Sequence, residues 1–361
     1  MKTLLFTLEY PPFHGGVANY YGNLTKYWPI EERLIVLDNS RDELLAHEKF
    51  FNWFPSIFAL NEKLSREKIE YLLVGQILPL GTAAYIVSLF KKINYSVILH
   101  GMDLAMALRT PRKRFISKLI LNRADKIICA NSYVQGGLLE FLPELEDRII
   151  IVNPGIEGGS PDINPSDIQE IKNTYNLEGK KILLSLGRLV KRKGVDKVIE
   201  SIINMPEEET TELIYFIAGA GPREEYLKNL VPPRYSKKII FLGSLTEYDK
   251  WMWLKTCDVF IMPSRDIEGD FEGFGIVYLE ANLCAKPVIA GNSGGVKDAV
   301  VEGETGLLVD PENINEISGA IRMLLSDNNL RDKLGKQGKD RAVREFSWEK
   351  QVSKLWNFVK E

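Results

Sequence analysis

Residues 181–204 read KILLSLGRLVKRKGVDKVIESIIN. The first six residues are a short apolar run, and residues 195–204 place apolar side chains at helical spacing. A strand, a glycine-bounded loop and a helix in this order form the repeating unit of a parallel α/β sheet. The segment therefore predicts a parallel sheet with a loop at the carboxyl end of a strand, where open α/β sheets bind ligands.

The same alternation of short apolar runs and helical stretches extends along the whole chain. Turn-forming residues at 153–161 interrupt it and serve as the predicted linker between two domains, residues 1–155 and 156–346. The predicted strands are Thr3–Leu8, Arg33–Leu37, Tyr71–Val74, Val97–His100, Lys126–Ala130, Ile149–Val152, Lys181–Leu186, Leu213–Ala218, Lys238–Phe241, Val259–Met262, Pro287–Ala290 and Gly306–Val309. The predicted helices are Val17–Trp28, Pro111–Arg123, Tyr133–Phe141, Val195–Asn204, Arg223–Leu230, Thr246–Lys255, Ile276–Cys284, Ile314–Leu325 and Asn329–Glu345, with a final helix after Trp348.

Composition narrows the class of protein. The chain has 361 residues, of which 45% are apolar and 26% charged, and this suits two globular domains. The net charge of −3 offers no overall attraction to nucleic acid. Three scattered cysteines and three histidines, with no CxxC pair, argue against a zinc site and suggest free thiols in a reducing cytoplasm. No apolar run is long enough to span a bilayer.

The basic loop after the strand 181–186 is the first candidate site. Gly187 and Gly194 bound it, and it holds four cations. Arginine can clamp two phosphate oxygens and lysine acts as a point charge, so the loop suits a diphosphate. The alternative is an ordinary solvated turn. We favour Arg188 and Lys193 as ligand-facing and expect Lys191 and Arg192 to face solvent.

Two glutamates frame the second candidate site. Glu272 lies just before the predicted helix 276–284, and Glu280 lies within it, eight residues further on. An anion between them would meet the free N–H groups of the helix start, and hydroxyls at either end would meet a carboxylate. A sugar nucleotide has this order of hydroxyls, phosphates and hydroxyls.

Three further strand ends carry weaker signals. Gly15-Gly16 follow the first strand, directly after His14, and can admit a phosphate or form an ordinary turn. Gly219 opens a Gly-Ala-Gly-Pro turn, for which a purely structural role is favoured. His100, with Asp103 three residues on, ends a strand of the first half, where structural and functional roles are equally expected.

Residues 109–126 combine seven cations with interleaved apolar side chains. On a helix this produces one apolar and one basic face. The favoured interpretation is that Phe115, Ile116, Leu119 and Ile120 pack into the core while the basic face is solvated. The alternative is contact with an anionic membrane surface.

Taken together, these motifs resemble those of family 4 glycosyltransferases, over nearly the full length of the chain. The loop before Glu272 is most similar to the subgroup of bacterial phosphatidylinositol-mannoside mannosyltransferases. One departure is Leu283-Cys284-Ala285, where the family usually has Ala-Cys-Gly, so a different turn is expected at Ala285. The motifs that carry the resemblance are Pro11-Pro12 with Gly15-Gly16, Gly187-Arg188 with Lys193-Gly194, Gly219–Pro222, Met262–Arg265, Glu272 with Glu280, Lys286–Ile289, Gly294-Gly295 and Glu304–Val309.

The resemblance implies the GT-B fold, with two Rossmann-like domains whose parallel sheets face an interdomain cleft. The N-terminal domain would bind the acceptor and the C-terminal domain the nucleotide sugar, and the last helix, about residues 347–361, would pack back on the N-terminal domain. It also implies residue roles. The catalytic residues would be Arg188, Lys193, Glu272 and His100; the donor would contact Gly15, Gly16, Gly187, Gly219, Phe274, Gly275, Ile276 and Glu280; and Asp103 and His14 would lie on the acceptor side.

The function that the resemblance implies is retaining transfer of a hexose from a nucleotide-diphosphate sugar to a hydroxyl acceptor, such as a lipid or cell-surface glycan precursor. GDP-mannose is the favoured donor and UDP-glucose the second choice, with no metal or other cofactor required. We expect a cytoplasmic enzyme that does not bind nucleic acid, with peripheral contact at the inner membrane face as an open alternative. A non-catalytic sugar-nucleotide-binding module of the same fold is the rival function.

Overall fold

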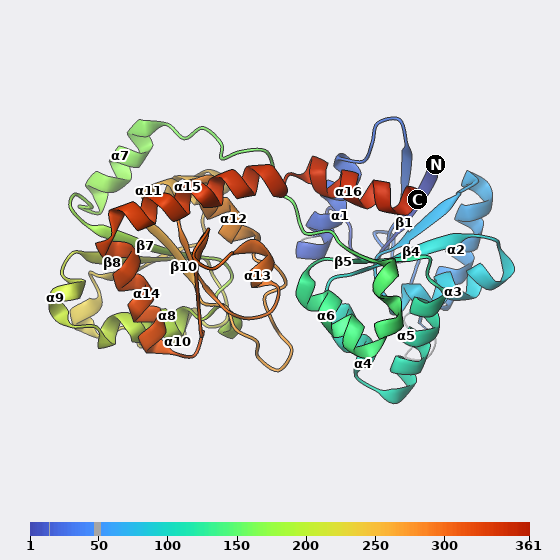
Figure 1. Ribbon diagram of the computed structural model, residues 1–361, viewed down its shortest axis with the longest axis horizontal. Helices are drawn as coiled ribbons and strands as arrows, with labels where there is room; N and C mark the ends of the chain where they lie inside the picture. Colours follow the sequence, from blue (N-terminus) through green and yellow to red (C-terminus); the bar gives the residue numbers. More distant parts are fainter. Residues whose placement is uncertain (14, 47–51) are drawn as a thin grey trace. The chain divides into compact units, whose positions relative to one another are not determined.

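The structure, a computed structural model, describes residues 1–13, 15–46 and 52–361. The chain folds into two compact units (Figure 1). The N-terminal unit consists of Met1–Gly155 together with Trp348–Glu361, and the C-terminal unit is Ile156–Ser347. Each unit holds one six-stranded parallel sheet, so the predicted parallel α/β class is confirmed. No helix in the described part of the chain is both long and apolar enough to cross a membrane.

The N-terminal sheet has the strand order β2-β1-β3-β4-β5-β6. Its strand β1 pairs in parallel with β2 and β3, so that Leu4 lies opposite both Ile35 and Leu72. The strands are β1 (Lys2–Phe6), β2 (Arg33–Leu37), β3 (Tyr71–Val74), β4 (Asn94–Leu99), β5 (Lys126–Cys129) and β6 (Ile149–Ile151). The helices are α1 (Gly16–Lys26), α2 (Phe54–Glu67), α3 (Leu80–Phe90), α4 (Met102–Leu108), α5 (Pro111–Arg123), α6 (Ser132–Phe141), the 3-10 turn η1 (Pro143–Arg148) and α16 (Trp348–Lys360).

The two faces of this sheet bury different helices because successive side chains of a strand point to opposite sides. Leu4 and Phe6 of β1 join the larger core cluster, which contains residues of α2 to α6. Leu5, between them, belongs to the opposite cluster with residues of α1 and α16. Trp348 at the start of α16 contacts Tyr20 of α1 edge to face, with ring centroids 5.5 Å apart. The last helix is thus an integral layer of the N-terminal unit.

The C-terminal sheet has the strand order β12-β11-β10-β7-β8-β9. Its strands are β7 (Lys181–Leu186), β8 (Leu213–Ala218), β9 (Ile239–Gly243), β10 (Val259–Met262), β11 (Val288–Gly291) and β12 (Gly306–Val309). Its helices are α7 (Pro165–Thr174), α8 (Val195–Asn204), α9 (Glu207–Thr210), α10 (Glu224–Asn229), α11 (Glu247–Thr256), α12 (Ile276–Leu283), α13 (Val296–Ala299), α14 (Ile314–Ser326) and α15 (Asn328–Glu345), with the 3-10 turns η2 (Lys191–Lys193) and η3 (Pro233–Tyr235).

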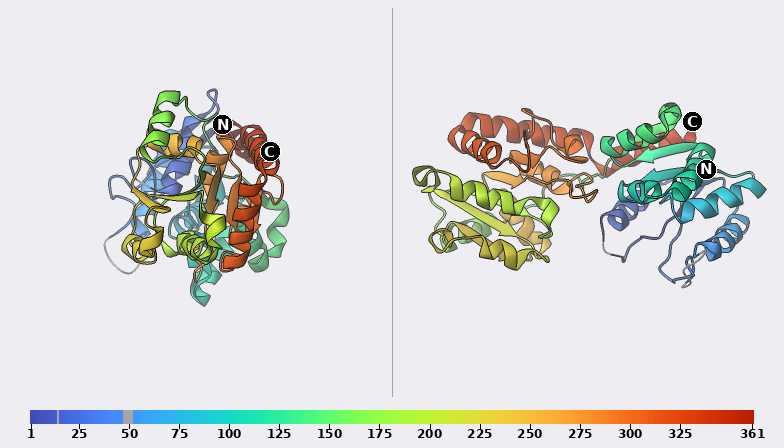
Figure 2. Two further views of the ribbon diagram at one scale, coloured as in Figure 1. Left: turned by 90° about the vertical axis from the view of Figure 1, so that its left-hand side faces the viewer. Right: turned by 90° about the horizontal axis from the view of Figure 1, so that it is seen from below.

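Successive side chains of β7 again point to opposite faces of the sheet and pack against different helices. Leu184 packs in a cluster with residues of α11, α12 and α15, whereas Leu183 packs with residues of α8 and α14. Figure 2 shows helices on both sides of the sheet in each unit. The carboxyl ends of the strands are left to loops, and these loops hold most of the candidate site residues.

The predicted strands all appear within a few residues of their predicted ends, but several helices were not predicted. These are α2, α3, α4, α7, α9 and α13. In α3, LGTAAYIVSLF is apolar almost throughout, and such a run cannot be assigned to helix or strand by periodicity alone. Tertiary packing against α2 and α5 decides its helical state.

The prediction that all four apolar residues of α5 pack into the core was wrong. Ile120 is fully buried and Ile116 packs partly against the core. In contrast, Phe115 is 64% exposed and Leu119 38% exposed. Residues four apart share one face of a helix, so Phe115 and Leu119 form a separate exposed pair beside the buried one.

Candidate functional site

The basic loop follows β7 in the C-terminal unit. The exposed Arg188 side chain forms no ion pair within the described residues. Gly187 donates its N–H to the Ala218 carbonyl at 3.0 Å, which joins the loop to the end of β8. Gly219 has φ 125°, and a Cβ there would lie 2.0 Å from the Gly187 carbonyl oxygen. Glycine at 219 therefore allows the two strand-end loops to touch.

Lys193 and Glu272, 79 residues apart in sequence, meet at this edge. The Lys193 Nζ lies 2.5 Å from Glu272 Oε2, and both side chains are almost buried, at 12% and 11% exposed. The arrangement joins a candidate phosphate-binding cation to a candidate sugar-binding carboxylate. A ligand phosphate would compete with Glu272 for the ammonium group.

The expectation that Arg192 faces solvent was wrong. Its side chain is only 24% exposed, and its Nε lies 3.1 Å from Asp270 Oδ1. Lys191 is exposed, as expected. The loop from 264 to 271 folds against the basic loop and draws Arg192 inward, a tertiary contact that the sequence does not indicate.

Arg265 is a residue that the residue-level reasoning missed. It is 3% exposed, and its guanidinium lies 2.7 Å from Asp196 and 3.1 Å from Glu312. It also donates from Nε to the Lys191 carbonyl, and its backbone N–H donates to the Arg192 carbonyl. Arg265 therefore holds the basic loop in place. The sequence did contain a signal for this residue, because the arginine follows a buried strand and Pro-Ser directly.

The start of α12 lies beside this pair. Gly275 has φ 79°, where a Cβ would lie 2.3 Å from the Tyr278 ring. Tyr278 donates its hydroxyl to the Met262 carbonyl at 2.7 Å and so fixes α12 to β10. The N–H groups of Phe274, Gly275 and Ile276 donate no hydrogen bond within the described residues. Free amides at a helix start form an anion-binding position.

Glu280, one turn into α12, is held by a second ion pair. Its Oε1 lies 2.7 Å from Lys250 Nζ of α11, and Lys250 also pairs with Glu247 at 2.8 Å. Burial raises the pKa of Glu280, and the neighbouring Lys250 opposes that rise. Lys250 thus stabilises the carboxylate form and was not foreseen as a site residue, because nothing local connects α11 to α12.

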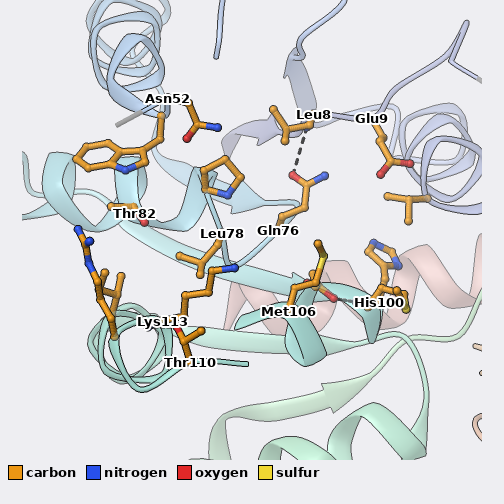
Figure 3. Close-up of a pocket in the computed structure, with 17 residues that line it drawn as sticks. Leu8, Glu9, Asn52, Gln76, Leu78, Thr82, His100, Met106, Thr110 and Lys113 are labelled. Atoms are coloured by element: carbon orange, nitrogen blue, oxygen red, sulfur yellow. Dashed lines mark hydrogen bonds between the residues drawn. The ribbon is translucent and has the colours of Figure 1, made fainter. Parts of the chain in front are cut away.

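The N-terminal unit holds a cavity of about 850 Å³ at the carboxyl edge of its sheet. In Figure 3, Glu9 and His100 lie on one side of the cavity and Asn52 and Thr82 on the other. Lys113 extends into it from α5. Its wall comprises Leu8, Glu9, Val17, Asn52, Trp53, Gln76, Leu78, Pro79, Thr82, His100, Met102, Asp103, Met106, Thr110, Arg112, Lys113 and Ile116.

His100 is held in one orientation by two tyrosines. Tyr21 donates its hydroxyl to the Gly75 carbonyl at 2.7 Å, and His100 Nε2 lies 2.8 Å from the same hydroxyl oxygen. Because the tyrosine proton is engaged, Nε2 carries the histidine proton and donates it. Burial lowers the His100 pKa to about 4, so the ring is neutral near pH 7. Tyr20 packs edge to face on it, with ring centroids 5.0 Å apart.

Asp103 is fixed through one carboxylate oxygen. Oδ1 accepts the backbone N–H groups of His100 at 3.0 Å and Gly101 at 2.9 Å. Burial raises the Asp103 pKa to about 6, although these hydrogen bonds oppose the rise. Oδ2 is buried and has no hydrogen-bond partner within the described part of the chain. A buried polar atom without a partner is unusual and points to a ligand.

Glu9 was quoted in the sequence motif but not predicted as a site residue. It lines the cavity, and burial raises its pKa. A Cβ on Gly15 would lie 3.5 Å from Glu9 Oε2, whereas one on Gly16 would meet no atom within 4 Å. His14, predicted on the acceptor side, lies outside the described residues.

The predicted residues thus form two groups, each within one unit. Arg188, Lys193, Glu272 and Glu280 line one edge of the C-terminal unit, with Gly187, Gly219 and the start of α12. His100 and Asp103 line the cavity of the N-terminal unit. Within the described residues, no cluster of three histidine, cysteine or acidic side chains could hold a metal ion.

Comparison with known proteins finds a family match over the C-terminal unit. Residues 167–341 match the family described as "Glycosyl transferases group 1". This match contains Arg188, Lys193, Glu272 and Glu280 and falls entirely within the C-terminal unit.

Relatives extend the similarity to nearly the full chain. An uncharacterized glycosyltransferase of Methanocaldococcus jannaschii is 27% identical over 98% of this chain and 96% of its own length. A GDP-mannose-dependent alpha-(1-6)-phosphatidylinositol monomannoside mannosyltransferase of Mycobacterium tuberculosis is 25% identical over 99% of this chain and 98% of its own. The crystal structure of Anabaena HepE in complex with UDP has a TM-score of 0.80 at 17% identity and covers 100% of both chains.

Proposed function

We propose that the chain is a group 1 glycosyl transferase with the GT-B fold and that it transfers a hexose from a nucleotide-diphosphate sugar to a hydroxyl acceptor with retention of configuration. The observation that carries the proposal is the Lys193–Glu272 pair beside the free amides of α12. It combines a cation, a carboxylate and a helix start at one strand edge, and this set matches the phosphates and hydroxyls of the donor.

Each donor-side residue then has a distinct role. Arg188 and Lys193 bind the diphosphate, and the amides of residues 274–276 bind its remaining oxygens. Glu272 accepts hydrogen bonds from the sugar hydroxyls, while Glu280, held by Lys250, accepts them from the ribose. Gly187 and Gly219 shape the edge, and Gly15 and Gly16 belong to the donor contacts of the N-terminal unit.

The reaction breaks the bond from the sugar C1 to the diphosphate oxygen and forms a bond from C1 to the acceptor oxygen on the same face. The acceptor proton passes to an oxygen of the departing diphosphate. Negative charge grows on that diphosphate in the transition state, where fixed positive groups are most effective. Arg188, Lys193 and the helix amides supply that positive charge. His100, neutral and oriented by Tyr21, and Asp103 contact the transferred sugar or acceptor.

The donor is proposed to be GDP-mannose, as named for the mycobacterial relative, with UDP-glucose as the alternative suggested by the UDP complex of HepE. Thermal unfolding with GDP, UDP and ADP and their sugars tests the choice. A ligand at a hundred times its Kd adds about 2.7 kcal/mol of stability. GDP should raise the Tm most, and an equal response to every nucleotide, or to none, would refute the donor assignment.

Turnover separates the enzyme from a non-catalytic binding module. Wild-type protein with the preferred donor should release nucleotide diphosphate, and NMR of the product should show the donor's anomeric configuration. Arg188→Gln tests the role of Arg188 in this reaction without disturbing other contacts, because the exposed Arg188 side chain forms no ion pair within the described residues. Nucleotide binding without any transfer or hydrolysis would favour the module.

Membrane contact is a further part of the proposal. Phe115 and Leu119 form an exposed apolar pair on α5, and Arg114 and Lys118 lie on the same helix. Exposed apolar side chains among cations are typical of helices that lie in an anionic interface. Flotation with vesicles containing anionic lipid should recover the wild type but not Phe115→Ser/Leu119→Ser. Equal recovery of both proteins would exclude this surface.

A further inference from the structure

We propose that Arg265 is a positioning residue for the transfer reaction, because its guanidinium fixes Lys193 and Glu272 relative to each other. The inference rests on the proposed function and adds a residue that acts without touching the donor. Arg265 lies just past β10, at the carboxyl edge of the C-terminal sheet, and is only 3% exposed. A side chain with so little accessible surface acts on the reaction through the groups that it holds.

Each nitrogen of the Arg265 guanidinium has an acceptor on a different segment of the chain. Nε donates to the Lys191 carbonyl at 3.1 Å, Nη2 lies 2.7 Å from Asp196 Oδ2, and Nη1 lies 3.1 Å from Glu312 Oε1. Lys191 belongs to the basic loop, Asp196 to the first turn of α8, and Glu312 to the connection between β12 and α14. One buried side chain thus joins three segments that are separate in sequence.

The backbone around Arg265 also contacts the basic loop. Arg265 donates its N–H to the Arg192 carbonyl at 2.8 Å. Gly194 has φ 71°, and a Cβ there would lie 2.0 Å from the Pro263 carbonyl oxygen. The loop therefore lies against the segment after β10 on both sides of Lys193. A shift of this segment would move Lys193 with it.

The chain continues from this segment to Glu272, the second member of the ion pair. A tight turn comes first, in which the backbones of Ile267 and Asp270 exchange two hydrogen bonds of 3.0 and 2.9 Å. Asp270 Oδ1 lies 3.1 Å from Arg192 Nε, and the Glu272 carbonyl accepts the N–H of Gly295 at 3.0 Å. Both members of the ion pair are therefore attached to one framework, with the guanidinium at its centre.

The three acceptors require a guanidinium. Its donors form a rigid planar fork and it stays protonated in proteins, whereas a lysine ammonium is a point charge on a flexible stem. A lysine at position 265 would keep the positive charge beside Asp196. It would not reach the Lys191 carbonyl and Glu312 from the same position. Arg265→Lys therefore removes the fork and leaves the buried charge in place.

A change in this framework should affect the reaction step more than donor binding. Fixed charge stabilises the departing diphosphate only where it is correctly placed, and a misplacement of about 1 Å caused by a distant substitution can cost about a hundredfold in rate. Binding of the donor also uses Arg188 and the amides of residues 274–276. Arg265 forms no hydrogen bond with any of these groups within the described part of the chain.

The test compares the wild type with Arg265→Lys and with the matched control Arg341→Lys. Arg341 of α15 is a similar guanidinium in the same unit, with its side chain 13% exposed. It donates to the carbonyls of Ala299 at 2.9 Å and Asp298 at 2.8 Å, and its Nε lies 2.9 Å from Glu345. None of these contacts is a residue proposed to bind the donor. Steady-state kinetics yield kcat and the donor KM, and urea unfolding gives the stability.

Arg265→Lys should lower kcat by about ten- to a hundredfold. The donor KM should stay close to its wild-type value, the pattern for an interaction needed only in the transition state. Arg341→Lys should lose similar stability and keep the wild-type kcat. Should Arg265→Lys fail to fold, the isosteric Asp196→Asn replaces it and should lower kcat by about tenfold with KM preserved, a loss below the hundredfold limit for a misplaced group.

Two results would overturn the inference. One is a kcat for the Arg265→Lys protein, or for its Asp196→Asn replacement, that is no lower than that of Arg341→Lys. The other is a raised donor KM with unchanged kcat, which would mean that Arg265 supports donor binding alone. Wild-type turnover reports on the proposed function separately. If it is present while the variant keeps its kcat, only the positioning role falls. If the wild type shows no turnover, the transfer function fails and this inference falls with it.

Discussion

The polar groups of the two units are prepared in opposite ways. At the C-terminal edge, Lys193 is paired with Glu272, Lys250 with Glu280, and Arg265 with Asp196. In the N-terminal cavity, Asp103 Oδ2 and the cations Arg112 and Lys113 lack partners within the described residues. Paired charges keep their geometry without a ligand, whereas unpaired ones depend on the ligand for their partners.

This contrast suits two different tasks. The donor is always the same compound, so its binding site can consist of charged groups that the protein holds in fixed positions. Fixed charges stabilise the departing diphosphate most effectively. An acceptor cavity gains selectivity from buried polar atoms that only the right ligand satisfies. Four predictions test the contrast, from the largest expected effect to the smallest.

The largest effect is expected at Lys193. Lys193→Met should lower transfer by about a hundred- to a thousandfold, the range seen when one fixed group that stabilises transition-state charge is removed. Steady-state rates with the preferred donor provide the measurement. The substitution also leaves Glu272 buried without its partner, which destabilises the protein by about 3–5 kcal/mol.

The double variant Lys193→Met/Glu272→Gln separates these two consequences. Removing both charges should restore much of the stability, as followed by urea unfolding, but not the activity. Recovery of activity together with stability would mean that the pair is only structural, and the contrast between the units would then have no functional meaning.

The second prediction concerns Asp103 and pH. Its folded pKa of about 6 lies above the ordinary value of 3.8, so the native state binds the proton more tightly than the unfolded state. Its contribution to stability is therefore present below about pH 4 and is lost as the pH rises to about 6. Asp103→Asn should remove this dependence and gain about 2 kcal/mol relative to the wild type between pH 4 and 7.

Unfolding free energies of both proteins across this pH range provide the test. The asparagine side chain of the variant keeps the contacts of Oδ1, because its amide oxygen can accept the same two N–H groups. The comparison therefore isolates the charge of the carboxylate from its hydrogen bonds. A constant difference between the two proteins at every pH would show that Asp103 has an ordinary pKa and a partner for its charge.

The third prediction concerns Lys250. Lys250→Met removes the partner of Glu280, whose pKa is already raised by burial, and should raise it further. Nucleotide affinity should fall by about tenfold, equal to ~1.4 kcal/mol, and the loss should be greatest at low pH where Glu280 is protonated. Titration calorimetry with GDP or UDP between pH 5 and 8 measures this. A loss that is independent of pH would point to altered packing of α11 instead.

The smallest effect is expected at Ala285, after α12. Ala285 has φ 54°, a left-handed conformation that costs a residue with a Cβ roughly 1–2 kcal/mol. Ala285→Gly should stabilise the protein by about 0.5–1 kcal/mol, because the greater entropy of glycine in the unfolded chain offsets part of the relief. The Tm should rise while nucleotide affinity stays unchanged. A changed affinity would show that the strand edge with Lys193, Glu272 and Glu280 is less rigid than its ion pairs suggest.

Much of the architecture was predictable because it depends on local patterns. The run KILLSL became β7 with its predicted ends, and β8, β10 and β12 also matched. Short runs of buried β-forming residues between turn signals leave few alternatives. The uniformly apolar α3 could be assigned neither to a helix nor to a strand from its sequence. On α5, the exposed pair Phe115 and Leu119 could not be distinguished from the buried pair, because composition does not say which face of a helix contacts the core.

The sequence by itself determined the parallel α/β class, the chemistry of the loop 187–194 and the two glutamates eight residues apart. These are properties of neighbouring residues, and spacing along a strand or helix expresses them directly. Only the tertiary structure decided the partners, Glu272 for Lys193 and Lys250 for Glu280, and brought Asp103 and the cations of α5 into the lining of one cavity. Lys193 and its partner lie 79 residues apart, and contact between them depends on how strands order themselves in a sheet. The tertiary fold also determines which charged side chains have a partner within the described residues and which do not.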